Sequence, residues 1–124
     1  MIYIIDHQDS FTWNVVHQFS KFDKVFCSNY FNINKKKLDQ SNTIILSPGP
    51  GSPKDYPFTS KIYKKYKGKK KIIGICLGFQ HILFCEGAKI VQQYLHLRKI
   101  EYVEIPNRYL LFFFYLCTFY KFLK

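Results

Sequence analysis

Four short apolar runs divide the sequence, at residues 2–5, 25–27, 43–46 and 72–75, and each is followed by a polar residue or a cysteine. Each run is shorter than a buried helix, and its apolar residues do not alternate with polar ones as they do in a half-exposed strand. A short continuous apolar run is typical of a strand buried on both faces. Segments of helical length separate most of them. The sequence therefore predicts an α/β protein with a mostly parallel sheet.

Three helices are expected around these strands, because apolar residues recur there at steps of three or four. The polar segment 28–42 is expected to be a connection. The four strands and three helices follow one another as β-α-β-β-α-β-α, an order that implies a doubly wound sheet with function at the carboxyl ends of the strands. The expected helices run from Phe11 to Lys21 with the stripe Val15, Phe19 and Phe22, from Phe58 through Ile62 to Tyr66 with Gly68 as the stop, and from Leu77 to Glu86 with Gly87 as the stop.

The formal net charge of +11 raises the question of a nucleic-acid partner. The lysines gather in segments 35–37 and 61–71, between apolar segments, where solvated loops and helix faces belong. No nucleic-acid-binding motif accompanies them. We expect a solvated surface and no nucleic-acid partner.

The cysteines and the first residues bear on the cellular compartment. Cys27, Cys76, Cys85 and Cys117 form no CxxC pair, so neither a disulfide framework nor a metal site is expected. The chain enters an apolar strand at once, without a basic segment and cleavage site for secretion. A reducing, cytoplasmic location is expected.

Cys76 lies where the fourth strand ends and a helix begins, in segment 74–80, which reads Gly-Ile-Cys-Leu-Gly-Phe-Gln. This is the arrangement of a nucleophile elbow with cysteine in place of serine, in which small glycines let the strand and helix approach each other. The positive end of the helix and the intrinsic reactivity of sulfur favour a thiolate nucleophile. The alternative is an inert core cysteine.

Three motifs in this order resemble one family: Ile5-Asp6 followed by Asp-Ser-Phe-Thr at 9–12, Ser-Pro-Gly-Pro-Gly at 47–51, and segment 74–80. They are similar to class I (Cys-nucleophile) glutamine amidotransferases, and among these to the amidotransferase subunit shared by anthranilate synthase and aminodeoxychorismate synthase. The resemblance covers residues 1–92. It implies the flavodoxin-like α/β fold of that family, incomplete at the C-terminus.

The resemblance also implies a mechanism. Cys76 would attack the side-chain amide of glutamine, form a glutamyl thioester and release ammonia to a larger, chorismate-binding synthase subunit. No metal or organic cofactor is implied. The first-loop residues Asp6, Asp9, Ser10 and Thr12 are interpreted as structural or partner-contact positions. The implied oxyanion-hole donors are the amides of Gly51 and Leu77, and the implied glutamine-binding residues are Gly49, Pro50, Gly51 and Gln80.

Two family motifs do not occur in the sequence: Arg-Tyr-His-Ser-Leu, which helps to bind glutamine, and His-Pro-Glu, which supplies the catalytic base and its acid. His7 is expected to be a solvated loop residue and His81 a residue of a helix face, and neither is expected to replace the base. His96 is followed by Leu-Arg-Lys, where the family has a His-Gly-Lys turn. Activity is therefore expected to be poor or absent.

Residues 93–124 are expected to form a divergent tail behind the amidotransferase part, 1–92. The apolar run 109–120 is interrupted by Lys121 and is shorter than the roughly 20 residues that span a bilayer. It also lacks the polar face of an interfacial anchor. A tail created by truncation or frameshift is favoured over an anchor.

The leading hypothesis is thus an impaired glutaminase subunit of tryptophan or folate-precursor synthesis, two pathways that the sequence does not separate. One alternative is a non-catalytic remnant or docking module that binds a synthase subunit. Another is a basic protein that associates with membranes through the aromatic run. A related amidotransferase that serves another acceptor is the last.

Overall fold

A computed structural model describes residues 1–95, 98–105 and 108–110. The chain divides into two compact units, Met1–Cys85 and a second unit that begins at Glu86. The boundary expected after residue 92 remains a prediction. The apolar run expected at 109–120 lies outside the described residues from 111 on.

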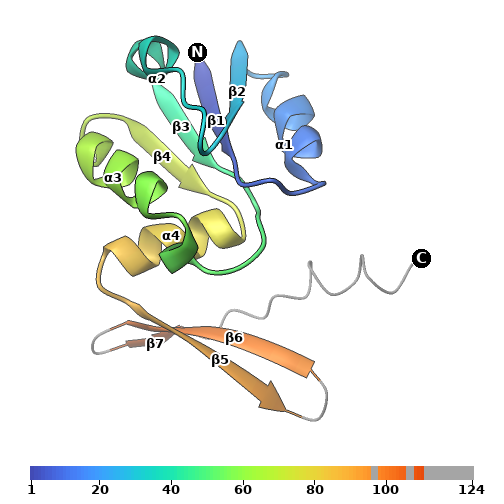
Figure 1. Ribbon diagram of the computed structural model, residues 1–124, viewed down its shortest axis with the longest axis vertical. Helices are drawn as coiled ribbons and strands as arrows, with labels where there is room; N and C mark the ends of the chain where they lie inside the picture. Colours follow the sequence, from blue (N-terminus) through green and yellow to red (C-terminus); the bar gives the residue numbers. More distant parts are fainter. Residues whose placement is uncertain (96–97, 106–107, 111–124) are drawn as a thin grey trace. The chain divides into compact units, whose positions relative to one another are not determined.

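The first unit contains a four-stranded sheet in the order β2-β1-β3-β4, with all neighbouring strands parallel (Figure 1). The strands are β1 (Ile2–Asp6), β2 (Val25–Asn29), β3 (Thr43–Leu46) and β4 (Lys71–Gly74). The central strands β1 and β3 are almost completely buried, as expected for parallel strands covered on both faces. The predicted strands are confirmed to within two residues at each end.

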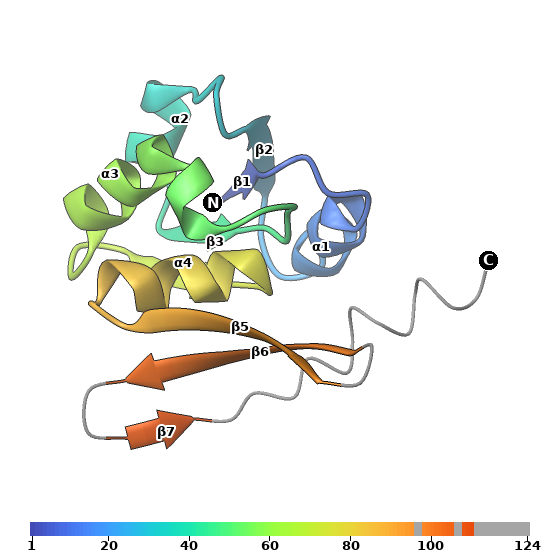
Figure 2. The same cartoon turned by 60° about the horizontal axis from the view of Figure 1, so that its bottom comes forward.

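Helices cover both faces of this sheet (Figures 1 and 2). Helix α1 (Thr12–Phe19) packs against one face, where Val15 contacts a core of Ile2, Ile4 and Ile45. Helices α2 (Lys35–Gln40) and α3 (Pro57–Tyr66) cover the other face. Strands and helices share a core there, whose buried residues are Tyr3, Ile5, Leu38, Ile44, Leu46, Ile62 and Tyr66. Helix α4 (Leu77–Cys85) follows β4. The doubly wound α/β class is confirmed.

Helix α2 is a correction, because the sequence indicates only a connection over segment 28–42. The helix begins behind Asn34, whose side chain accepts a hydrogen bond from the amide of Lys37 at 3.0 Å, and Leu38 is its one buried residue. One apolar residue in six gives no periodicity. The Asn34 cap is the signal that sequence reasoning missed.

Two expected apolar stripes are also corrected. Helix α1 ends at Phe19, so Phe22 lies beyond it and is 81% exposed. Phe58, in the first turn of α3, is 41% exposed, although Ile62 and Tyr66 of the same helix are buried. A stripe therefore does not extend to the end of a helix when no element covers that end.

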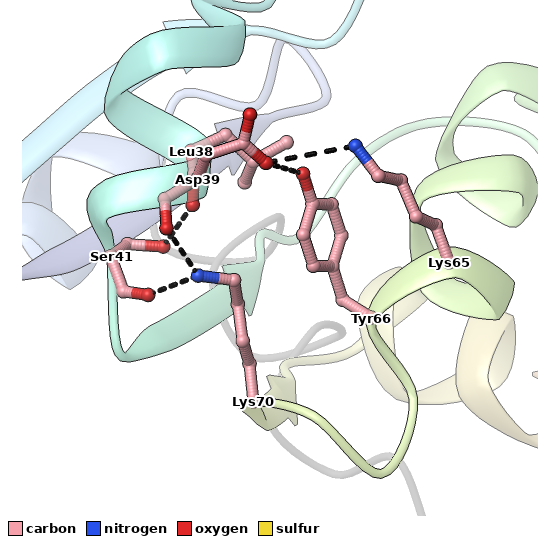
Figure 3. A network of polar contacts seen from close by, with 6 residues as sticks. All are labelled: Leu38, Asp39, Ser41, Lys65, Tyr66 and Lys70. Carbon is pink, nitrogen blue, oxygen red and sulfur yellow. Dashed lines mark hydrogen bonds and ion pairs between the residues drawn. The ribbon is translucent and has the colours of Figure 1, made fainter.

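Side chains from α3 and the loop behind it hold the end of α2 (Figure 3). The Tyr66 hydroxyl donates to the carboxylate of Asp39, which also forms an ion pair with Lys65 at 3.6 Å. The ammonium of Lys70 donates to the backbone carbonyls of Asp39, at 2.8 Å, and of Ser41. A cation thus satisfies carbonyls that the helix leaves free at its C-terminus.

The second unit contains an antiparallel sheet in the order β5-β6-β7. Its strands are β5 (Lys89–Leu95), β6 (Arg98–Ile105) and β7 (Arg108–Leu110). Among the described residues, no helix has both the length and the apolar character to cross a membrane.

Candidate functional site

The candidate site is built from three loops at the carboxyl edge of the parallel sheet. They follow β1, β3 and β4, and the strand order reverses between β1 and β3, where doubly wound proteins bind their ligands. Backbone hydrogen bonds continue past the strand ends, from the amide of Ser47 to the carbonyl of Ile5 at 3.1 Å and from Ile75 to Leu46 at 3.0 Å. The three loops therefore start from fixed positions.

Cys76 occupies a strained turn between β4 and α4. Its φ angle is +54°, a left-handed conformation that costs a residue with a Cβ atom about 1–2 kcal/mol. The turn is closed by a hydrogen bond from the amide of Gly78 to the carbonyl of Ile75, and the Cys76 carbonyl accepts the amide of Gln80, both at 3.0 Å. This is the backbone conformation of a nucleophile elbow.

Two glycines make the elbow possible. A Cβ atom on Gly74 would lie 2.4 Å from the carbonyl carbon and oxygen of Gly78, and one on Gly78 would lie 2.1 Å from the carbonyl oxygen of Leu46. Both contacts are with backbone, which cannot rotate away as a side chain can. The glycines on either side of Cys76 thus allow the start of α4 to rest directly on β3 and β4.

The loop after β3 reaches the start of α4. A Cβ atom on Gly49 would lie 2.7 Å from Cδ2 of Leu77 and 2.5 Å from Cβ of His7, so only glycine fits between them. Gly51 has a φ angle of +77°, and a Cβ there would meet the carboxylate of Asp55 at 2.6 Å. The sequence-predicted residues Gly49 and Leu77 therefore lie together.

The other sequence-predicted residues differ in exposure. Pro50 and Gly51 are exposed, whereas Leu77 and Gln80 are buried, the latter 5% exposed on α4. Cys76 is half-buried. The backbone at Pro50 and Gly51 is thus accessible next to the elbow, whereas the residues of α4 at the site are packed in the core.

Residues of the first loop hold the loop itself. The Asp6 carboxylate accepts hydrogen bonds from the hydroxyl of Thr12 at 2.9 Å and the amide of Gln8 at 2.8 Å. The carboxylate of Asp9 accepts from the amide of Phe11 at 2.8 Å and so fixes the entry into α1. For Asp6, Asp9 and Thr12 these contacts bear out the structural interpretation. Ser10 is exposed.

His7 is not the solvated loop residue that the sequence suggested. Its side chain is completely buried, and its Nδ1 lies 3.2 Å from the carbonyl of Ser47 while its Nε2 lies 3.1 Å from the hydroxyl of Thr59. Because a carbonyl only accepts, Nδ1 carries the proton and Nε2 accepts from Thr59. Burial lowers the pKa of His7 to about 4, against weaker opposing effects of Ser47 and Asp6.

His81 is also completely buried, on the inner side of α4. Its Nε2 shares a hydrogen bond with the hydroxyl of Ser60 at 2.8 Å, while its Nδ1 has no hydrogen-bond partner among the described residues. Burial, and then the nearby His7, lower its pKa to about 4. Both imidazoles are therefore neutral at physiological pH and packed between elements.

Tyr56 belongs to the site, although sequence reasoning did not single it out. It follows the 3₁₀ turn Pro53–Asp55, and its hydroxyl donates to the carbonyl of Pro50 at 2.7 Å. Its ring meets the ring of His7 edge-on, with centroids 4.9 Å apart. An aromatic residue before Pro57 carries no sequence signal for this role, because the contact depends on the path of the loop.

The fold and the site together define a doubly wound α/β protein with a cysteine at a nucleophile elbow, next to a glycine-proline loop. A family model, described as "Glutamine amidotransferase class-I", matches residues 3–108. The chain belongs to the class I glutamine amidotransferase family.

Curated relatives show which members of this family the chain resembles. The chain is 36% identical to anthranilate synthase component 2 of Pyropia yezoensis over 95 residues, which are 74% of this chain and 50% of the relative. It is 37% identical to the protein of that name from Lactococcus lactis, over 73% of this chain and 46% of the relative. For aminodeoxychorismate synthase component 2 of Escherichia coli the identity is 32%, over 74% and 51%. The chain spans about half the length of the curated relatives it matches.

A solved structure has the same fold. It is described as a putative GMP synthase subunit from Thermoplasma acidophilum, and it matches 73% of this chain and 47% of its own with a TM-score of 0.59 and 23% identity. The likeness supports the architecture of the parallel sheet and its helices. The domain is thus a glutamine amidotransferase domain like component 2 of anthranilate and aminodeoxychorismate synthases.

Proposed function

We propose that Cys76 is the nucleophile that captures glutamine. Its sulfur attacks the side-chain carbonyl carbon of glutamine, and the carbon–nitrogen bond breaks. The leaving nitrogen takes up the proton that the thiol gives up and departs as ammonia, so that a glutamyl thioester remains on the cysteine. The observation that carries the proposal is the left-handed φ angle of +54° at Cys76. The residue lies between Gly74 and Gly78, where any side chain would clash with backbone atoms. Such strain persists where the surrounding structure imposes it, and it clusters at active sites.

The backbone amides of Gly51 and Leu77 are the proposed oxyanion-hole donors. They would stabilise the negative oxygen of the tetrahedral intermediate, and each donor in such a site is worth about 3 kcal/mol. The contact between Gly49 and Leu77 supports this role, because it holds the loop against the start of α4. Gly49, Pro50, Gly51 and Gln80 are the proposed glutamine-binding residues.

The proposed partner is a larger synthase subunit that binds chorismate and receives the ammonia. The names of the curated relatives, component 2 of anthranilate or aminodeoxychorismate synthase, support this partner. The proposal covers both anthranilate synthase and aminodeoxychorismate synthase as the partner enzyme, because the partner subunit determines which acceptor receives the ammonia. No metal or organic cofactor enters the proposed reaction.

We further propose that turnover by this chain alone is strongly impaired. The sequence contains no His-Pro-Glu motif. The Nε2 atoms of His7 and His81 are engaged with Thr59 and Ser60, so these buried imidazoles are poor candidates for a substitute base. Loss of a triad partner costs on the order of 10⁴-fold or more in turnover.

The test is release of glutamate from glutamine by the purified chain, with and without a chorismate-using synthase subunit, against a Cys76→Ser control. In parallel, a chloroketone analogue of glutamine should alkylate Cys76, which mass spectrometry detects. Labelling without turnover is the expected result. If the analogue does not label Cys76 faster than its D-enantiomer does, the proposed glutamine site is wrong.

A second candidate function is a non-catalytic module that docks on a synthase subunit. It is favoured by large exposed aromatic side chains near the first loop, Trp13 at 70% and Phe31 at 66% exposure. This candidate predicts partner binding that Cys76→Ser leaves intact and Trp13→Ala weakens. Binding unaffected by Trp13→Ala and Phe31→Ala would argue against it.

A further inference from the structure

The peptide that joins Pro50 to Gly51 determines where one proposed oxyanion-hole donor points. Its carbonyl belongs to Pro50 and its N–H to Gly51. The described chain contains no cis peptide bond. In a planar trans peptide the carbonyl and the N–H point in opposite directions, so whatever holds the Pro50 carbonyl also directs the Gly51 N–H.

Tyr56 holds that carbonyl. Its hydroxyl donates to the Pro50 oxygen at 2.7 Å, and its side chain is 6% exposed. The ring is fixed edge-on against His7, at a centroid distance of 4.9 Å, and against Tyr30, at 4.8 Å. The donor is therefore anchored among aromatic rings, of which Tyr56 and His7 are buried and Tyr30 is half-buried.

The peptide would otherwise turn easily. Gly51 has no Cβ atom and lies at a φ angle of +77°, so rotation of the preceding peptide meets little steric resistance. The loop is held on both sides of this peptide, by the hydrogen bond from Ser47 Oγ to the Pro48 carbonyl at 2.7 Å and by the carboxylate of Asp55, which accepts the amide of Ser52 at 2.7 Å. These contacts fix the ends of the loop, whereas Tyr56 acts on the peptide itself.

We propose that the hydroxyl of Tyr56 is a positioning group, which turns the N–H of Gly51 toward the acyl oxygen of a substrate held at Cys76. This inference rests on the proposed function. The hydroxyl remains a donor at neutral pH, because burial raises the pKa of Tyr56 above its usual value. A positioned donor requires no reorganisation when the oxygen gains its charge.

The variant Tyr56→Phe removes the hydroxyl and keeps the ring. The matched control is Tyr66→Phe, which removes the hydroxyl of another buried tyrosine that bonds to Asp39. Two alkylation rates of Cys76 are compared in each protein. One reagent is the chloroketone analogue of glutamine, whose ketone oxygen takes the place of the amide oxygen, and the other is iodoacetamide, which needs no oxyanion hole.

The ratio of the chloroketone rate to the iodoacetamide rate should fall about tenfold or more in Tyr56→Phe and stay unchanged in Tyr66→Phe, since direct loss of one donor costs about 10²–10³-fold. A ratio in Tyr56→Phe within twofold of the unaltered chain would overturn the inference. The conformation is tested separately by crystal structures of the unaltered chain and Tyr56→Phe. The inference requires a rotated Pro50–Gly51 peptide in the variant, and an unchanged peptide refutes it.

Labelling of the unaltered chain tests the proposed function, and the rate ratio in Tyr56→Phe tests this inference. Failure of the chloroketone to label the unaltered chain would contradict the glutamine site, and with it a donor aimed at glutamine. Normal labelling with an unchanged rate ratio in Tyr56→Phe would leave the glutamine site standing and remove Tyr56 from it.

Discussion

The imidazole rings of His7 and His81 are stacked with their centroids 6.2 Å apart, and neither side chain is exposed. His7 belongs to the loop after β1 and His81 to α4, so the pair joins two elements that carry the candidate site. Burial lowers the pKa of each ring to about 4, and for His81 the neighbouring His7 adds to the effect. The pair is stable only as two neutral rings.

Stability should therefore fall on mild acidification. Below the unfolded pKa of about 6.5 the unfolded chain binds protons at both histidines, while the folded chain does not until about pH 4. Stability is lost wherever the unfolded state binds more protons as the pH falls. Urea midpoints measured between pH 7 and pH 5 should decline steadily.

The control for this prediction is His17→Gln, which removes an exposed histidine on α1 and should leave the decline unchanged. His81→Gln should lower stability at pH 7 and flatten the decline. A midpoint that stays constant from pH 7 to pH 5 in the unaltered chain would contradict the neutral buried pair.

The left-handed backbone at Cys76 predicts an inverted order of two substitutions. In the middle of a helix or strand, a protein with glycine is less stable than the same protein with alanine by about 0.5–1 kcal/mol. At Cys76 glycine relieves the strain of a positive φ, so Cys76→Gly should be more stable than Cys76→Ala by about 1 kcal/mol. Thermal unfolding of the two variants measures the difference.

Cys85, the last residue of α4, provides the matched site. There Cys85→Gly should be less stable than Cys85→Ala, as in any helix. The same order at both cysteines would mean that the elbow is not strained in solution.

Because α4 lies so close to β3, adding a single methyl group at Gly78 should lower the stability of the protein strongly. In Gly78→Ala the new Cβ would lie 2.1 Å from the carbonyl oxygen of Leu46, and the backbone would have to move, at a cost of about 3 kcal/mol. Gly68→Ala is the comparison, because Gly68 has a φ angle of +74° but no atom within 4 Å of the place that a new methyl group would take. Only the conformational cost of about 1 kcal/mol applies there. Equal losses in urea unfolding would contradict the steric explanation.

The contacts of Lys70 with the end of α2 predict a local effect. Lys70→Met keeps the apolar stem and removes the cation that binds the carbonyls of Asp39 and Ser41, which should cost about 0.5–1 kcal/mol. Amides of α2 should exchange faster with solvent, while those of β1 keep their protection. Lys69→Met, at the exposed neighbouring lysine, should change neither. A uniform loss of protection across the sheet would show that Lys70 acts on the whole fold.

The sequence predicted the parts of the site that depend on local chemistry. Each of the four strands contains a short apolar run, and the elbow at Cys76 lies where the last strand leads into a Gly-x-Cys-x-Gly segment. The steric need for Gly74 is local too, because a Cβ atom there would meet the backbone of Gly78 within the same turn. These features are encoded in neighbouring residues, and pattern reasoning recovers them.

The parts that were missed depend on distant contacts. His7 and His81 look like polar residues of a loop and a helix face, yet their hydrogen-bond partners Ser47, Thr59 and Ser60 come from other elements. The contact between Tyr56 and Pro50 depends on a loop path that no periodicity describes.

The strained turn at Cys76 has a consequence for folding. Its left-handed backbone is imposed by β4, which pairs with β3, and by α4, which rests on Leu46. Chain closure between these elements costs entropy before their contacts repay it. In a nascent or partly unfolded chain Cys76 therefore lacks this left-handed conformation. The elbow conformation exists only once the sheet is assembled, so the proposed nucleophile takes its position only when tertiary structure is complete.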